Sequence, residues 1–410
     1  MVRCFISFVQ LFCISTIAVS MTAYAEESDS PWSISGFGNI TAGYLDTNQA
    51  NFLGYSNNVS VEPESLVGLQ ATFTFDNNLS ATLQGTLKAD EKDNDDILNW
   101  AYLTWTPDDN LTFKLGRMRT AFFALSDIID VGYSYPWITS PQKTYSGWLF
   151  PNYDGLDVSW GKNFNQFDAT FEGYIGTYKG QIDLSDHYTD IDVDVFGGLI
   201  AKLYFNNVEF RVSHHRGEVD VDLTSQIAGV ASNLTTAIEQ TYLAGGDPSQ
   251  LIALANSLNS SANSTKGYVD VDQISLFYDN LNFFSRAEWM KITSSMSFSP
   301  RIESYYLSAG YTIFPWTFYA TYSHSLVEYN SQIESIRNNA LFEPITSYLS
   351  DDSVRTWSIG ARWDVIPKVA LKAEVCLIDG YSGKNSFFDS IEDGFDRDAT
   401  LYKISMEWVF

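Results

Sequence analysis

Apolar and polar residues alternate with a period of two along most of the chain, and this pattern constrains the fold more than any other feature. In Arg355–Val365, one set of alternate residues is apolar and the other is largely polar, and Val369–Ile378 repeats the pattern. Successive side chains of a β-strand point to opposite faces, so these segments predict strands with one apolar face. The chain is therefore predicted to be an all-β protein.

The connections between the predicted strands alternate between short and long. Asn206–Asn207 is a tight turn, whereas Asp90–Asp96 and Gly383–Ala399 are long, polar and acidic. A soluble sandwich also has alternating strands, but it has no reason to sort its connections by length. A transmembrane barrel does so, with short periplasmic turns and long external loops.

Counting strands between these connections gives about sixteen, which use roughly 160 residues at about ten residues each. Fourteen or eighteen strands also fit the pattern. The predicted starts include Trp32, Leu79, Phe167, Val208, Val369 and Thr400. The fold class predicted is a transmembrane antiparallel β-barrel.

The N-terminus predicts export from the cytoplasm. Arg3 precedes the apolar stretch Phe5–Val19, and Ala23–Ala25 has the small-x-small pattern of a cleavage site. Residues 1–25 are therefore predicted to be a secretory signal peptide, which leaves 26–410 as the barrel. Two of the three cysteines lie in this signal, so an intramolecular disulfide is not expected.

The composition excludes one class of partner. The chain has 24 Lys and Arg residues against 50 Asp and Glu residues, a net charge of −26, so nucleic acid is not an expected partner. Much of the acidic excess lies in long connections such as Glu392–Asp398. These are expected to be solvated or to bridge through divalent cations to lipopolysaccharide. No spacing predicts a specific metal site or a cofactor.

The last residues are as regular as any other segment. Tyr402–Phe410 alternates up to Trp408, and its apolar set is predicted to face lipid. Aromatic rings gather at membrane interfaces, so Trp408 and Phe410 are predicted to anchor the closing strand at the periplasmic interface. Other tryptophans predicted near an interface are Trp105, Trp316, Trp100, Trp289 and Trp357.

With these features, the chain resembles the trimeric porins of the Gram-negative outer membrane. The resemblance rests on the signal peptide, the first strand Ile34–Tyr44, the number of strands and the terminal Phe410. It implies a homotrimer in contact with outer-membrane lipid and lipopolysaccharide, with a water-filled channel for small hydrophilic solutes. It also implies that the barrel-insertion machinery reads the last strand, and that the third long loop folds into the barrel.

That third loop, Arg119–Trp148, is rich in apolar and aromatic residues, which are costly to expose to water. Asp127 and Asp130 on it are expected to face a basic wall. Arg117 breaks the alternation of its strand. Either a bulge at Gly116 returns it to the lumen, which is the favoured interpretation, or it lies above the bilayer. The predicted pore constriction comprises Arg117, Arg119, Asp127 and Asp130. The aromatic rings of the loop either stack against solutes or fix the loop to the wall.

Alternation also places a set of cations on the inner face. These predicted pore-wall residues are Lys114, Lys202, Arg211, Arg286, Arg362 and Lys372. They either shape ion flow or are simply part of a solvated interior that carries both signs of charge. The connection Asp222–Gly267 has helical periodicity and is a lid, a trimer contact or a plain loop.

The function predicted is passive diffusion of small hydrophilic solutes and ions. The alternatives are a channel specific for a sugar or an organic acid, and a structural or adhesive barrel that transports nothing. An enzyme is not predicted, because adjacent His214 and His215 face opposite sides of one strand, and the spacing of Ser213 offers no paired nucleophile.

Overall fold

The computed structural model describes residues 30–76, 78–90, 97–138, 140–141, 150–183, 188–221, 234–236, 238–249, 251–252, 255, 266–296, 299–329, 351–381 and 386–410. The predicted signal peptide and most of 222–267 lie outside these residues, although 234–236 and 238–243 are helical as expected. Among the described residues, no helix is long and apolar enough to cross a membrane.

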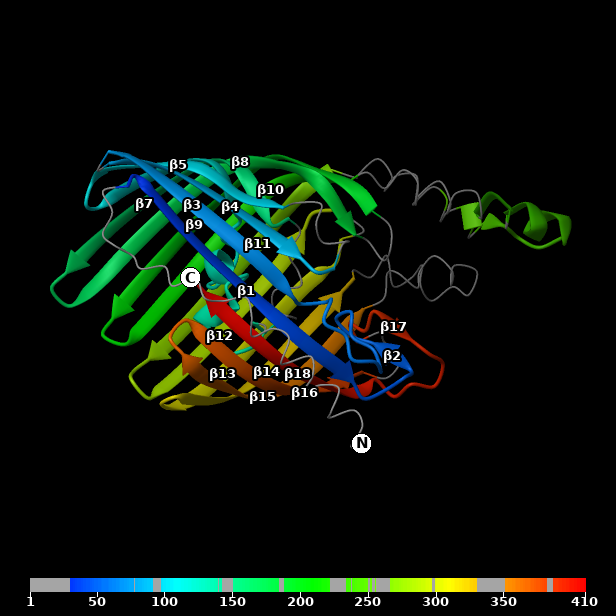
Figure 1. Cartoon of the computed structure of the whole chain (residues 1–410). Helices are drawn as coiled ribbons and strands as arrows, with labels where there is room; N and C mark the ends of the chain where they lie inside the picture. The colour runs from blue at the N-terminus through cyan, green and yellow to red at the C-terminus, as the bar shows by residue number, and fades with distance from the viewer. Residues whose placement is uncertain are drawn as a thin grey trace, which may run out of the picture.

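Sixteen antiparallel strands close into a barrel in chain order, so the predicted fold class is confirmed. Figure 1 shows β1 in blue beside β18 in red, where the two ends of the sheet meet. The barrel strands are β1 (Trp32–Leu45), β3 (Leu66–Asp76), β4 (Leu79–Lys88), β5 (Leu98–Asp108), β6 (Leu111–Arg119), β7 (Asn152–Phe164), β8 (Phe167–Asp183), β9 (Tyr188–Phe205), β10 (Val208–Val221), β11 (Lys266–Asp279), β12 (Phe283–Ser294), β13 (Arg301–Ile313), β14 (Trp316–Glu328), β15 (Asp352–Ile366), β16 (Val369–Gly380) and β18 (Asp398–Val409).

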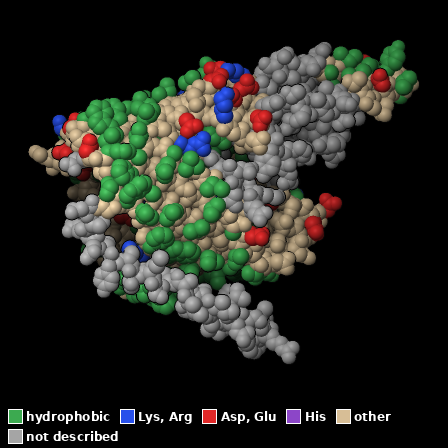
Figure 2. Space-filling view, turned by 45° about the horizontal axis from the view of Figure 1, so that its top comes forward, with side chains coloured by type: hydrophobic (Ala, Val, Ile, Leu, Met, Phe, Trp, Pro, Cys, Tyr) green, Lys and Arg blue, Asp and Glu red, His purple; other side chains and the backbone are tan. Residues whose placement is uncertain are grey.

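The two faces of the wall differ as the alternation predicts. Ile359 on β15 lies opposite Ala320 and Val375, and all three point outward. Ser358, its neighbour along the strand, points inward beside Thr321 and Cys376, which are buried. Figure 2 shows hydrophobic side chains over much of the visible wall. A closed sheet of this kind satisfies its backbone hydrogen bonds internally, as a membrane requires.

The terminal residue closes the barrel. Gly36 N donates a hydrogen bond to Phe410 O at 3.2 Å, and Phe410 N donates to Gly36 O at 2.9 Å. A Cβ atom at Gly36 would lie 2.2 Å from the Phe410 ring, and one at Gly38 would lie 2.6 Å from the Trp408 ring. The two glycines thus make room for two outward-facing rings, which cover the seam between β1 and β18.

One tryptophan predicted to lie at the interface does not face outward. Trp100 lies opposite Gln84, after a β-bulge between Gln84 and Gly85. Gln84 is buried on the inner face, where its amide donates to Gln70 at 3.0 Å. The interfacial prediction is therefore wrong for Trp100, because its side chain alternates with the outward-facing Leu103 and Trp105 and points to the lumen.

Candidate functional site

The third loop, between β6 and β7, crosses the inside of the barrel. It contains two short 3₁₀ turns, η3 (Ser126–Ile128) and η4 (Gly132–Ser134). Beyond them, Trp137 is 1% exposed, and its Nε1 donates to Ser308 at 3.1 Å and Thr321 at 2.8 Å. These hydroxyl groups lie on the inner faces of β13 and β14, so the loop spans the lumen as predicted.

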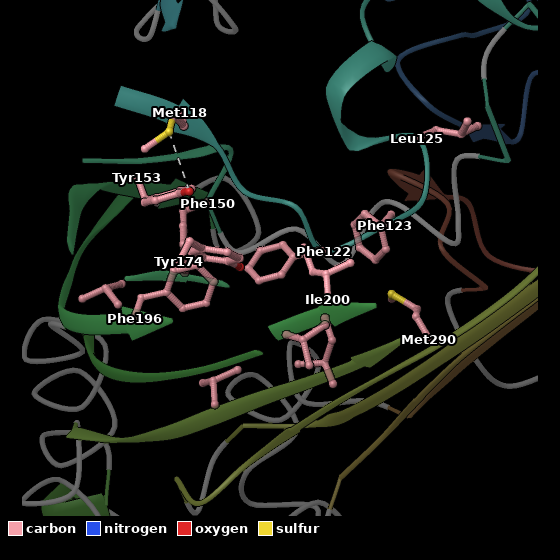
Figure 3. Packing of buried hydrophobic residues seen from close by; sticks show 14 of the residues in the cluster. Met118, Phe122, Phe123, Leu125, Phe150, Tyr153, Tyr174, Phe196, Ile200 and Met290 are labelled. Atoms are coloured by element: carbon pink, nitrogen blue, oxygen red, sulfur yellow. Dashed lines mark hydrogen bonds between the residues drawn. The ribbon is translucent and has the colours of Figure 1, made fainter. Parts of the chain in front are cut away.

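Aromatic side chains fill the space between the start of the loop and one side of the wall. The Phe122 ring lies 5.4 Å from Phe196 and 5.5 Å from Phe150, measured between ring centroids. Figure 3 shows the Phe122 ring pointing towards Tyr174, which comes from the wall. These buried rings explain why the loop is apolar.

Lys372 anchors the tip of the loop. Its Nζ donates to Gly132 O at 2.9 Å, to Tyr135 O at 2.8 Å and to Trp137 O. The same ammonium group forms an ion pair with Glu407 at 2.6 Å, and Lys372 is 3% exposed. One wall cation therefore donates to three backbone carbonyl groups of the loop tip.

Arg362 holds the same segment from the next strand. Its Nη1 donates to Tyr133 O at 2.6 Å and to Tyr135 O at 3.2 Å. Its Nη2 lies 2.8 Å from Asp364 Oδ1, and its guanidinium group stacks 4.5 Å from the centroid of the Tyr133 ring. The guanidinium group therefore bonds the loop and a carboxylate at the same time.

Arg211 and Glu288 anchor the start of the loop. Arg211 is 1% exposed and donates to Ala121 O and to the Gln273 amide oxygen. Glu288 Oε1 accepts hydrogen bonds from Ala124 N at 2.8 Å and from Gln273 Nε2 at 2.7 Å. Wall side chains thus fix the loop at both its beginning and its tip.

The hydrogen bonds of Ser213 differ from the sequence expectation. His215 Nε2 lies 2.8 Å from Ser213 Oγ, and His215 Nδ1 lies 2.7 Å from Tyr174 Oη. Residues two apart on a strand share a face, so Ser213 and His215 do pair, contrary to the prediction. His215 is 0% exposed and Ser213 is buried, so this network supports the wall and offers no surface to a substrate.

Arg117 is not part of the constriction. The pairing of β6 with β7 runs without a shift through Gly116, and Arg117 lies opposite Asp154 on the outer face. The two side chains form a bidentate ion pair at 3.1 Å and 3.2 Å. Gly116 adopts a φ of +137° within regular pairing. No residue is inserted, so the predicted bulge is absent and Arg117 stays outside.

The two acidic residues of the loop have different surroundings. Asp130 forms an ion pair with Arg119, and both side chains are largely buried. Asp127 is exposed and lies near Lys114, Asp157 and Glu172 on the wall. The structure thus brings together Arg119 with Asp130, and Asp127 with Lys114.

The remaining wall cations are only partly covered. Lys114 lies opposite Asp157 in the register, and its Nζ is 5.7 Å from the centroid of the Tyr102 ring. Lys202 is half-buried on the inner face of β9. Arg286 lies 3.3 Å from Asp279 and within 5.3–5.7 Å of three aromatic rings, those of Phe277, Phe284 and Trp137.

The geometry is that of a barrel with a loop held across its lumen, and the sequence matches the model of one family, the Gram-negative porins, over residues 13–408. The chain belongs to the Gram-negative porin family. It is a channel of the outer membrane. No sequence among the curated proteins matches this porin.

Solved structures share the fold of this porin at low sequence identity. OmpF of Salmonella typhi in complex with daunomycin aligns with a TM-score of 0.56 and 8% identity, covering 92% of this chain and 97% of that one. The outer membrane channel DcaP of Acinetobacter baumannii aligns with a TM-score of 0.52 and 11% identity, covering 92% of this chain and 97% of that one. An anion-selective porin from Comamonas acidovorans aligns with a TM-score of 0.52 and 12% identity, covering 92% of this chain and 100% of that one.

The first and last long connections of the porin pack together. Their two-residue strands β2 (Ala50–Asn51) and β17 (Ser390–Ile391) form a small sheet. Phe52 from one connection lies 5.1 Å from Phe388 of the other, between ring centroids. Tyr55 Oη donates to Glu64 at 2.9 Å, and burial, followed by the Glu64 carboxylate, raises the pKa of Tyr55 well above its ordinary value.

A small cavity lies inside this packed region. Its volume is about 40 Å³, and the residues around it include Phe52, Trp137, Ser323, Thr356 and Glu374. A site of this size with several polar partners can hold water. Among the described residues, no group of three His, Cys, Asp or Glu side chains could hold a metal ion.

Proposed function

We propose that this porin allows small hydrophilic solutes and ions to diffuse passively through the part of the lumen that the third loop leaves open. The observation that carries the proposal is the anchoring of that loop across the barrel by Lys372 at its tip and Arg211 at its start. A fixed loop narrows a pore without closing it, and pore width and lining charge then select among solutes.

The residues proposed to border the open path are those that water can reach. They are Asp127 on the loop and Lys114 and Lys202 on the wall. The proposal leaves out Arg211 and Lys372, because buried groups bonded to the loop cannot act as a wall for ions. Asp130 is also left out, because Arg119 neutralises it.

Liposome swelling with sugars and organic acids of graded size tests the proposal. We expect rates that fall smoothly with solute size and do not saturate with concentration. Saturation by one sugar or one organic acid would instead support the substrate-specific channel. No swelling with any solute would support the structural or adhesive barrel and contradict transport. Catalysis forms no part of the proposed function.

Arginine at position 359 is expected to destabilise the folded porin by about 2–4 kcal/mol, because a charge there must enter the middle of the lipid face. Ile359 is 58% exposed on the outer face at the centre of β15. Denaturant titration in lipid vesicles measures the effect. The control is Ser159→Arg, which places the same side chain on the half-buried inner face of β7. Equal costs at both positions would contradict the assignment of the two faces.

Deletion of Phe410 is expected to lower the amount of porin in the outer membrane several-fold while leaving the other strands competent to pair. The residue adds two backbone hydrogen bonds to Gly36 and one interfacial ring, and we propose that the insertion machinery reads this end. Immunoblotting of outer-membrane fractions measures the change. Unchanged levels would reject this role.

We also propose that residues 1–25 are removed on export, that three copies associate, and that the outer face contacts lipid and lipopolysaccharide. The family supports each of these assignments. N-terminal sequencing of the mature protein and the mass of the detergent-solubilised complex test the first two.

A further inference from the structure

A buried carboxylate lies behind the open side of the channel. Asp157 on β7 is 4% exposed and points to the inner face, opposite Lys114 on β6 and Tyr174 on β8. Its Oδ1 atom is buried and accepts no hydrogen bond from any residue that the structure describes. A charge with so little compensation is costly unless a neighbouring group or ion offsets it.

The nearest groups add negative charge. Glu172 on β8 is one step along the strand face from Tyr174, and its carboxyl group lies within hydrogen-bonding reach of Asp157. Asp127 approaches the same place from the third loop and is exposed. Lys114 thus interacts electrostatically with all three carboxylates.

Nearby cations do not restore the balance. Lys202 lies opposite Thr170, which is further along β8 from Asp157 than Glu172 is. The acidic group beside Lys202 is Glu209. Arg211 is occupied by Ala121 O, Ser213 and Gln273. Arg119 is occupied by Asp130. The channel beside Lys114 thus carries an excess of negative charge.

We infer that Asp127, Asp157 and Glu172 form a cation site in the channel, which makes the porin prefer small monovalent cations, either an alkali ion or the ammonium group of an organic solute. Glu172 and Asp127 meet the ion, and Asp157 strengthens their field from behind the surface. The three carboxylates act through their electric field and do not chelate the ion, because no group of three such side chains among the described residues could hold a metal ion. The inference rests on the proposed function, because it names the solute class of the same channel.

The sign of this site is opposite to that of the anion-selective porin from Comamonas acidovorans, with which the chain shares its fold. Selectivity depends on which charges reach the water, and the fold does not determine that. The alternation in the sequence predicts a wall of inward-facing cations. In the structure, burial of Arg211 and Lys372 removes much of that wall from the channel.

Reversal potentials across planar bilayers test the inference, with gradients of potassium chloride and of methylammonium chloride. We expect the unmodified porin to favour the cation over chloride. Glu172→Gln and Asp157→Asn are each expected to lower the cation-to-chloride permeability ratio about threefold, the effect of one unit charge at about 6 Å in a water-like dielectric. Lys114→Gln is expected to raise the ratio.

The matched control is Asp154→Asn, which removes a carboxylate from the outer face of the same strand, three residues before Asp157. We expect this variant to keep the cation-to-chloride permeability ratio of the unmodified porin. A lower cation-to-chloride permeability ratio in either salt for Glu172→Gln and Asp157→Asn supports the site. An unchanged ratio in both salts overturns it, as would be found if Asp157 and Glu172 shared a proton. Preference of the unmodified porin for chloride also overturns it.

The two proposals fail differently. If the unmodified porin forms no conducting pore in the bilayer, the proposed function fails. If it conducts but the inner variants behave like Asp154→Asn, only the cation site fails. Each variant is first run on a denaturing gel with and without heating. A change in migration after heating shows that the unheated barrel was folded.

Discussion

Replacing Lys372 with methionine is expected to destabilise the folded porin by about 3–5 kcal/mol, which is the usual cost of removing one partner from a buried ion pair. Lys372 and Glu407 have side chains that are 0% and 1% exposed. Methionine fills a similar volume but leaves the Glu407 carboxylate without its counter-charge. It also leaves the carbonyl groups of Gly132, Tyr135 and Trp137 without their shared donor.

Urea titration of folding into lipid vesicles, followed by tryptophan fluorescence, measures this cost. The matched control is Lys202→Met, because Lys202 also faces inward but is half-buried near water. Its expected cost is within about 0.5 kcal/mol. The double variant Lys372→Met with Glu407→Gln is expected to recover part of the loss, because it removes both charges. Equal costs for the two lysines would show that the loop does not depend on Lys372.

The barrel itself could be predicted from the sequence because its determinants are local. The starts predicted at Trp32, Leu79, Phe167, Val208 and Val369 are those of the structure, and the last strand begins at Asp398 rather than Thr400. Alternation and turn residues fix the strands, and each strand needs only its two neighbours to form a closed sheet. Two faces are wrong. Trp100 alternates with the outward-facing Leu103 and Trp105 and points to the lumen, and Arg117 stays outside because its strand has no bulge.

For the residues of the site, the sequence predicts only the face of the wall on which each side chain lies, because alternation along a strand shows nothing more. Lys372 and Arg211 point inward as predicted, but the path of a long loop decides whether an inward-facing cation meets water or protein. Asp130 pairs with Arg119 at the end of β6, and both side chains are largely buried, which alternation along the strand does not reveal. Asp157 was missed, although its place between outward-facing Leu156 and Val158 marks it as inward-facing. No local pattern reports these long-range contacts.

Replacing Trp137 with alanine is expected to cost about 3–5 kcal/mol and to raise single-channel conductance. The cost is that of deleting a fully buried aromatic side chain. Trp137 fixes the loop tip through two hydrogen bonds, an edge contact with Tyr306 at 5.8 Å between ring centroids, and a cation–π contact with Arg286 at 5.7 Å. Without the ring, the tip loses its contact with β13 and β14, and water enters the space that the ring occupied.

Conductance in planar bilayers and a urea titration are measured on the same preparations. The control is Trp105→Ala, which deletes the same ring from the outer face, where Trp105 is 50% exposed and stacks on Phe113 at 5.2 Å. It is expected to leave conductance unchanged. Trp137→Phe keeps an aromatic ring but loses both hydrogen bonds, so we expect an intermediate stability and a smaller rise in conductance. If Trp137→Ala conducts like the unmodified porin, the narrowest point of the channel does not depend on the tip of the third loop.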